Sequence, residues 1–220
     1  GSLHPMEEPF AETVIGTERV AMILQNAESV FDIASNRPIM ETIAAFVRNP
    51  NISEPLITES QRVIADYLKS LYVLIADGAP PPGKNGRERI IKLLIRGVVT
   101  RQILLNINAQ SFLSSVFDSI AQTTHNDTQA SSKVKNRAVR YFSNESERFK
   151  DTIERGRRQL ERSLSKNGGH TLSGSQIVSL EKERGIPHMI TAMMLQDKGL
   201  RFNKTEYREA LAVWEKKPHN

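Results

Sequence analysis

The sequence of 220 residues predicts a mainly α-helical protein with one long charged helix and a short strand–helix segment near its beginning. Three observations predict this fold class. Apolar residues recur at helical spacing through most of the chain. The segment APPPGKNG (79–86) interrupts this pattern, because proline and glycine break both helices and sheets. Apolar residues from Phe142 to Leu164 then repeat at spacings of seven and four, which is typical of a long helix with one packed face.

The first predicted element is a short strand, PFAETVIG (9–16), and three helices are expected to follow it, over 17–25, 37–48 and 58–78. Thr17 and Thr58 are the expected N-caps, because a hydroxyl before a periodic segment can accept a hydrogen bond from the free backbone amides of the first turn. Gly78 is the expected end of the third of these helices.

The helix predicted over 87–105 has two distinct faces. Arg89, Lys92 and Arg96 stand at i, i+3 and i+7, and the apolar side chains of this segment occupy the opposite side (Ile91, Leu94, Ile95 and Val98). Further helices are predicted over 110–121 and 131–166. Two or three short helices are expected after them, including an apolar block at 186–195 and a final helix over 203–217.

Composition excludes several classes of protein and site. Without cysteine the chain has no disulfides, thiolate zinc sites or thiol nucleophile. No apolar run reaches the roughly 18–20 residues that a membrane span needs, and there is no signal peptide, so a cytoplasmic protein is expected. The five histidines are scattered, and there is no glycine-rich phosphate loop or nucleophile elbow. We therefore expect no metal site and no catalytic residue in this chain.

Charge is distributed unevenly along the chain. Residues 1–80 contain five basic and eleven acidic residues, whereas residues 81–220 contain twenty-five basic and fourteen acidic residues. A basic region of this size favours a polyanionic partner for the last two-thirds of the chain. A set of solvated helix faces is an equally good interpretation of the charge alone.

Two segments are candidate binding sites. Gly16 leads into Glu18 and Arg19 at the predicted start of a helix, where an arginine could present its planar donors to a phosphate; an ordinary surface pair is the alternative. The second candidate is the proline-glycine loop and the helix after it, where cations suit phosphates and an asparagine amide suits a base edge (Lys84, Asn85, Arg87, Arg89, Lys92 and Arg96). Its alternative is a plain loop followed by an amphipathic helix.

Four blocks of sequence resemble a known family. ETVIGTERVAMILQNAESVFDI (12–33) resembles the third class II motif of bacterial-type alanyl-tRNA synthetases, with its Gly-x-Glu-Arg core. The other three blocks are similar to the family's Ile-Ala-Asp-Gly loop and helix, its long helix, and the stretch that ends Tyr-Gly-Phe-Pro in typical members (75–99, 144–164 and 171–191). The four blocks occur in the family's order over nearly the whole chain.

The resemblance implies that residues 3–33 are the C-terminal end of a class II catalytic domain and that residues 34–220 are a helical tRNA-recognition domain. Gly16 and Arg19 would belong to the ATP site, while motifs 1 and 2 are absent. The chain alone would then hold no cofactor and would not activate alanine. The complete family enzyme uses ATP and Mg²⁺, and another chain or domain would supply its catalytic core. The implied partner is the acceptor stem of alanine tRNA, with Asn85 matching the asparagine that reads its wobble G·U pair.

Three positions depart from the family pattern. Glu12 replaces an aspartate that meets the ammonium of alanine, Val14 replaces a glycine of the alanine pocket, and Lys182 replaces the aspartate that also reads the wobble pair. A lysine cannot accept a hydrogen bond from a guanine amino group. A diverged paralogue, acting as a non-catalytic RNA-binding or regulatory protein, is therefore an alternative. A weaker alternative is a helical adaptor that binds a protein through the apolar face of 131–166.

Overall fold

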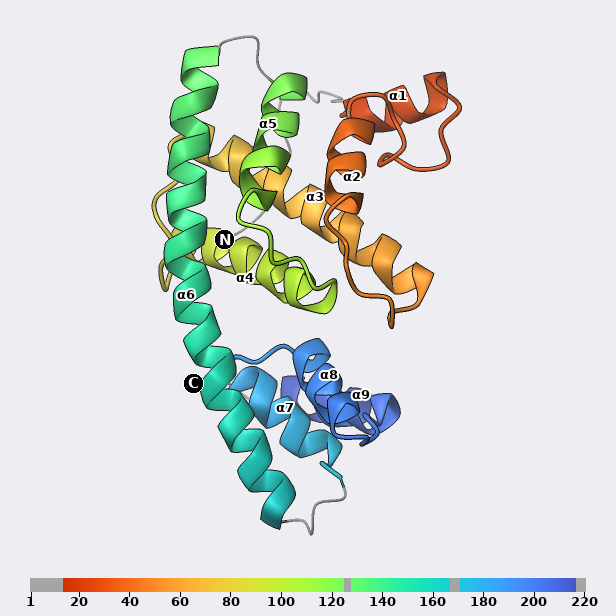
Figure 1. Ribbon diagram of the computed structural model, residues 1–220, viewed down its shortest axis with the longest axis vertical. Helices are drawn as coiled ribbons and strands as arrows, with labels where there is room; N and C mark the ends of the chain where they lie inside the picture. The colour runs from red at the N-terminus through yellow and green to blue at the C-terminus, as the bar shows by residue number, and fades with distance from the viewer. Residues whose placement is uncertain (1–13, 125–127, 167–170, 217–220) are drawn as a thin grey trace, which may run out of the picture.

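Nine helices follow one another in the residues that the computed structural model describes, which are 14–124, 128–166 and 171–216 (Figure 1). They are α1 (Thr17–Leu24), α2 (Arg37–Ala44), α3 (Glu54–Ala76), α4 (Gly86–Leu104), α5 (Phe112–Thr124), α6 (Thr128–Lys166), α7 (Gly174–Lys182), α8 (His188–Asp197) and α9 (Lys204–Glu215). The prediction of a mainly helical chain is confirmed. Residues 9–13 of the expected strand lie outside the described ranges, and Val14–Gly16 form no strand.

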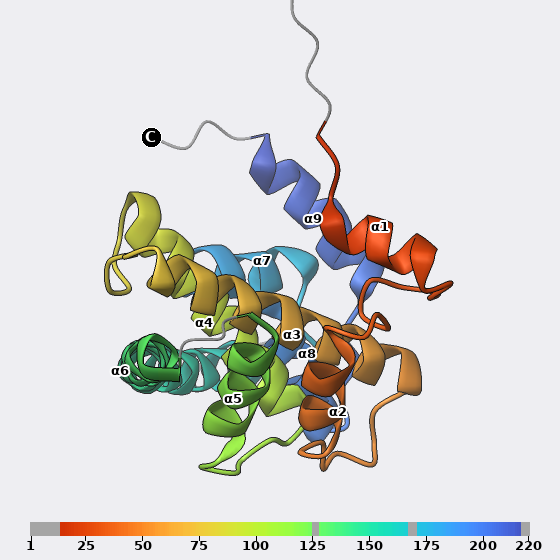
Figure 2. The ribbon, with the colours of Figure 1, turned by 90° about the horizontal axis from the view of Figure 1, so that it is seen from above.

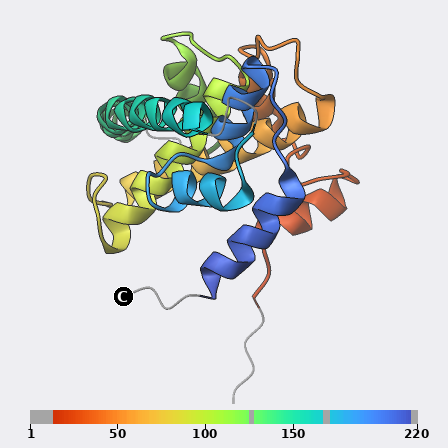
Figure 3. The ribbon, with the colours of Figure 1, turned by 90° about the horizontal axis from the view of Figure 1, so that it is seen from below.

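The long helix α6 runs along the side of the molecule and joins two lobes (Figure 1). The first lobe contains α1–α5 and the N-terminal part of α6, and the second contains α7–α9 and the C-terminal part of α6. In the view from above, α3 and α4 run side by side through the first lobe (Figure 2). The view from below shows α9 packed against α7 on the side away from α6 (Figure 3). Each lobe has its own hydrophobic core.

Two predicted N-caps, Thr17 and Thr58, are wrong, for local reasons. Helix α3 begins at Glu54, four residues before Thr58, because extended Ser53 precedes it and Pro55 fits its first turn. Helix α1 begins at Thr17 itself, with Gly16 as its N-cap and no side-chain cap bond. Proline in the first turn is also seen in α2.

Helix α6 contributes to both cores through the apolar face that the sequence predicts. Phe142 and Phe149 are buried in the first core, and Leu160 and Leu164 are buried in the second. Gly156 lies between these pairs, where a Cβ atom would come within 1.5 Å of the Ile186 side chain. The face that could have served an adaptor is therefore packed inside the chain itself.

Helices α7 and α9 pack at close range in the second lobe. Ser173 and Gln176 form a reciprocal capping box at the start of α7, which satisfies amides of its first turn. Gly174 follows directly, and a Cβ atom there would lie 2.2 Å from the Glu206 carbonyl oxygen. Only glycine leaves room for the two backbones at this separation. Across the described residues, no helix combines the length and apolarity needed to cross a membrane.

Candidate nucleic-acid interface

The loop between α3 and α4 folds back onto the first turn of α4. Gly78 ends α3 with a positive φ of 81°, and Ala79 is buried against the first core. The Gly83 amide donates to the Glu88 carbonyl at 3.1 Å, and a Cβ atom at Gly83 would lie 1.9 Å from the Glu88 carboxylate. This close approach fixes the loop and places residues 84 and 85 at its outer end.

The predicted binding residues of this loop and of the first turns of α4 follow one another closely in the chain and most of them are exposed. Lys84, Asn85, Arg87 and Arg89 are exposed and Lys92 is partly buried. Asn85 holds the N-cap position of α4, yet its side chain makes no cap hydrogen bond. In the part of the chain that the structure describes, these four cations form no ion pair. Their charges therefore face solvent without internal neutralisation, as contacts to phosphates require.

Arg96 belongs to the same predicted stripe but has a different environment. Its Nε lies 2.6 Å from Oε1 of Glu145 on α6, and the Glu145 side chain is only 3% exposed. The guanidinium also lies 4.9 Å from the centre of the Phe149 ring. Sequence reasoning missed this arrangement because Glu145 stands 49 positions later, on an element whose charged residues all looked alike.

Lys182 is one of the three positions at which the sequence departs from the pattern of the family that it resembles. It is the last residue of α7 and is exposed. Its Nζ lies 5.7 Å from the centre of the Trp214 ring on α9. The contact is of the cation–π type, which orients the ammonium group without neutralising it. Nothing in the sequence pattern links these two residues.

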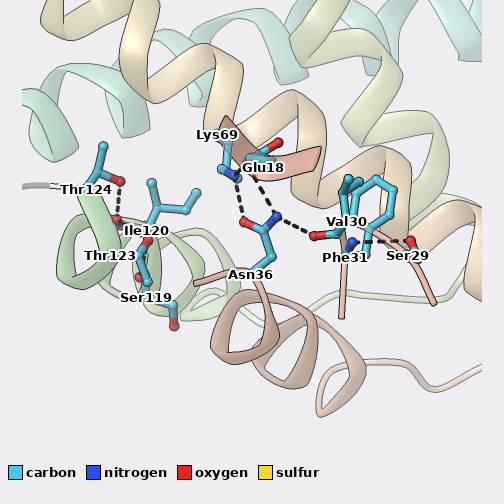
Figure 4. Close-up of polar contacts among 10 residues, drawn as sticks. All are labelled: Glu18, Ser29, Val30, Phe31, Asn36, Lys69, Ser119, Ile120, Thr123 and Thr124. Atoms are coloured by element: carbon cyan, nitrogen blue, oxygen red, sulfur yellow. Dashed lines mark hydrogen bonds and ion pairs between the residues drawn. The ribbon is translucent and has the colours of Figure 1, made fainter. Parts of the chain in front are cut away.

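Helix α1 is attached to the first lobe through polar contacts. Lys69 of α3 donates to Oε1 of Glu18 at 2.5 Å and to Oδ1 of Asn36 at 2.6 Å, and Asn36 donates to the Val30 carbonyl at 2.7 Å (Figure 4). No residue of α1 is buried, and Arg19 is exposed. Glu12 lies outside the described residues. The structure thus leaves Gly16 and Arg19 exposed at the edge of the molecule (Figure 1).

The attachment of α1 depends on an ionised carboxylate. The hydrogen bond from Lys69 holds the pKa of Glu18 below its ordinary value of 4.5, against the opposing effect of partial burial. This contribution to stability is complete above the unfolded-state pKa of about 4.5 and is lost as the pH falls through the lower folded-state value.

We therefore expect acid to release α1 before the lobes unfold. An NMR titration of α1 amide shifts from pH 6 to pH 3 should show a transition centred below 4.5. The Glu18→Gln variant should lack it. A transition of equal size in that variant would assign the release to another group.

A second polar cluster links the helices of the second lobe. Tyr207 of α9 donates to the Glu181 carboxylate, and His188 Nδ1 lies 3.2 Å from the other oxygen of Glu181. Burial raises the pKa of Glu181, but the hydrogen bonds from His188 and Tyr207 outweigh it and leave this pKa below its ordinary value. Burial and the bond to Glu181 raise the pKa of Tyr207. The cluster keeps α9 in place and holds no nucleophile. Among the described residues, no three His, Asp or Glu side chains converge to hold a metal ion.

The chain is similar to an alanine–tRNA ligase of Nitrosomonas europaea, with 27% identity over 212 residues, and to that of Nitrosospira multiformis, with 26% identity over 211 residues. Each alignment covers 96% of this chain but 24% of the relative, so the chain spans about a quarter of the length of the proteins it matches. Residues 1–219 match the family described as "tRNA synthetases class II (A)". The chain belongs to this family of class II tRNA synthetases.

Proposed function

We propose that this chain is the acceptor-stem recognition portion of an alanine–tRNA ligase or of a diverged homologue. The observation that carries the proposal is the exposure of four polar side chains at the α3–α4 loop and the start of α4, followed by the partly buried Lys92 (Lys84, Asn85, Arg87 and Arg89). The minor groove of an A-form helix is wide and shallow, so side chains on a protruding loop can reach base edges there. The cations would contact phosphates and the Asn85 amide would contact one base pair.

A titration with three RNAs, followed by fluorescence anisotropy at two salt concentrations, tests this function. The RNAs are an alanine tRNA, the same tRNA with its wobble G·U pair changed to G·C, and an unrelated tRNA. Salt-sensitive binding that is strongest for the wobble form is the expected result. Absence of binding to all three would contradict the proposal.

Arg87 and Arg89 should contribute through charge alone. Replacing both with alanine should weaken binding to all three RNAs. It should also reduce the slope of log binding constant against log salt concentration by about 1 for each phosphate that is no longer neutralised.

Asn85→Ala should instead leave this slope unchanged and cost about 1–3 kcal/mol of binding free energy on the preferred RNA only. Equal losses from Asn85→Ala on every RNA would remove its role as a base reader.

Alanine activation would require parts that this chain does not contain. We infer that Gly16 and Arg19 complete an ATP site only beside motifs 1 and 2, with Mg²⁺ held mainly outside this chain. The outward apolar side chains near α1 support a missing neighbour, since Val14 is 85% exposed and Leu24 is 81% exposed. A chain or domain carrying the remaining catalytic core would cover them. The chain alone would then not activate alanine. Its expected cytoplasmic location remains a prediction.

A diverged, non-catalytic RNA-binding or regulatory protein is the second candidate. The observation that favours it is Lys182, a cation held against Trp214 where the resembling family has an acid. Such a protein would bind the wobble and G·C forms of the tRNA equally well. The three-RNA titration therefore separates the two candidates.

A further inference from the structure

A pocket of about 320 Å³ lies between the two lobes. One wall comes from Tyr67 of α3 and Leu93 of α4, and the other from Gly185 and Pro187 in the turn between α7 and α8. The charged groups that line it are Arg96, Arg101 and Glu181. An occupant of this pocket would contact both lobes at once.

Two of these charged groups are already engaged with neighbouring residues. Nη2 of Arg101 donates to Glu59 at 3.1 Å, and its Nη1 lies 2.6 Å from the Met189 sulfur. Glu181 accepts the hydroxyl of Tyr207 and pairs with His188. Arg96 differs, since within the described ranges its Nη1 and Nη2 atoms have no hydrogen-bond partner. Both terminal nitrogens of Arg96 are therefore available to a ligand, whereas each terminal nitrogen of Arg101 already has a partner.

Arg96 is held by α6 and lies close to the turn between α7 and α8. On α6, the Glu145 carboxylate accepts a hydrogen bond from Nε of Arg96, and the Phe149 ring lies against the guanidinium group. The turn between α7 and α8 meets it from the other lobe, where a Cβ atom on Gly185 would be 3.8 Å from Nη1. An arginine oriented in this way loses little side-chain entropy when its remaining donors engage an anion.

The pairing explains why a carboxylate is buried at this place. A buried carboxylate needs a charged and well-aligned partner, because desolvation is costly. The Arg96–Glu145 ion pair adds little net stability compared with apolar residues of similar size. We therefore attribute its role to orientation of the Arg96 guanidinium. Arg89 and Lys92 stand on the same helix stripe as Arg96 and lead from the exposed surface toward the pocket.

We propose that Glu145 is a positioning residue that orients Arg96 to bind a phosphate of the RNA backbone in the pocket between the lobes. This rests on the proposed RNA-binding function. A phosphate oxygen would accept from Nη1 and Nη2, with Tyr67 and Leu93 lining the pocket on the α3–α4 side. Bound RNA would thus hold the two lobes together at this point.

The Glu145→Gln variant tests the positioning role, because the role and simple electrostatics predict opposite changes in RNA affinity. The glutamine keeps the size and an acceptor oxygen but removes a negative charge from a basic region. Electrostatics alone would tighten RNA binding. Loss of positioning should instead weaken it, by about five- to tenfold, which is the scale of one ordinary hydrogen bond.

Glu154→Gln is the matched control, because Glu154 forms an exposed ion pair with Arg157 on the same helix. It removes the same charge and should leave RNA affinity unchanged or slightly tighter. The Arg96→Met, Glu145→Gln double variant should bind RNA no more weakly than Arg96→Met alone, because Glu145 acts through Arg96. Thermal unfolding of each variant, followed by circular dichroism, shows that the affinities belong to folded protein.

Three results would overturn this inference while leaving the proposed function intact. They are wild-type or tighter binding by Glu145→Gln, weaker binding by the double variant than by Arg96→Met, and displacement of the RNA by micromolar AMP, which would assign the pocket to a free nucleotide. Persistence of the RNA complex in millimolar AMP supports the assignment to the RNA backbone. If the unaltered chain binds no RNA, the proposed function fails instead.

Discussion

Replacing Gly174 with alanine should lower the free energy of unfolding by about 3 kcal/mol, at the upper end for overpacking. The added Cβ would lie 2.2 Å from the Glu206 carbonyl oxygen and 2.9 Å from the Tyr207 amide nitrogen. Both are backbone atoms, so no change of rotamer relieves the overlap and α9 must move away from α7. For a chain of this size the unfolding midpoint should fall by about 6–12 °C, as measured by circular dichroism.

Two other glycines provide graded controls. At Gly156 the nearest atom is the end of the Ile186 side chain, which can rotate, so alanine there should cost less than at Gly174. At Gly16 the nearest atoms belong to the Arg19 side chain at 3.8 Å, so alanine should have almost no effect. A larger loss at Gly156 than at Gly174 would contradict the assignment of the α7–α9 contact to backbone packing.

Replacing Arg96 with methionine should destabilise the protein more strongly, by about 3–5 kcal/mol. The Glu145 carboxylate, at 3% exposure, would remain buried without a partner for its charge. The midpoint of thermal unfolding should fall by about 6–20 °C. Chemical denaturation with urea should show a lower midpoint with an unchanged slope.

A second substitution separates the charge from the packing. Adding Glu145→Leu to Arg96→Met removes the unpaired carboxylate and should restore most of the stability, because apolar residues often replace a buried ion pair at little cost. Arg89→Met, at an exposed position of the same helix, should change stability by less than about 0.5 kcal/mol. If the double variant is as unstable as Arg96→Met alone, the destabilisation comes from packing against Phe149.

The helices were predicted well where proline or glycine marks the end of a segment. The loop at 79–86 and the apolar face of α6 appear where they were expected, because proline, glycine and helical spacing act locally. The start of α3 was misplaced because Thr58 fits a cap as well as Ser53 does. Only the proximity of Pro55 and of the first core distinguishes the two.

The candidate site was predictable only for its exposed part. Lys84, Asn85, Arg87 and Arg89 follow a local motif and are exposed together. The partners of Arg96 and Lys182 lie 49 and 32 positions along the chain and could not be read from spacing. The pocket between the lobes needs five helices and the turn after α7 to meet, which no single stretch of sequence encodes.

The sharing of α6 between two cores has a consequence for the order of folding. Contacts of the second core join residues near one another in the chain, so closing their loops costs little entropy. The first core joins distant segments, such as Thr42 and Ser119, which are 77 positions apart. The second lobe should therefore form early and present a partly ordered α6 as the template on which the first lobe condenses.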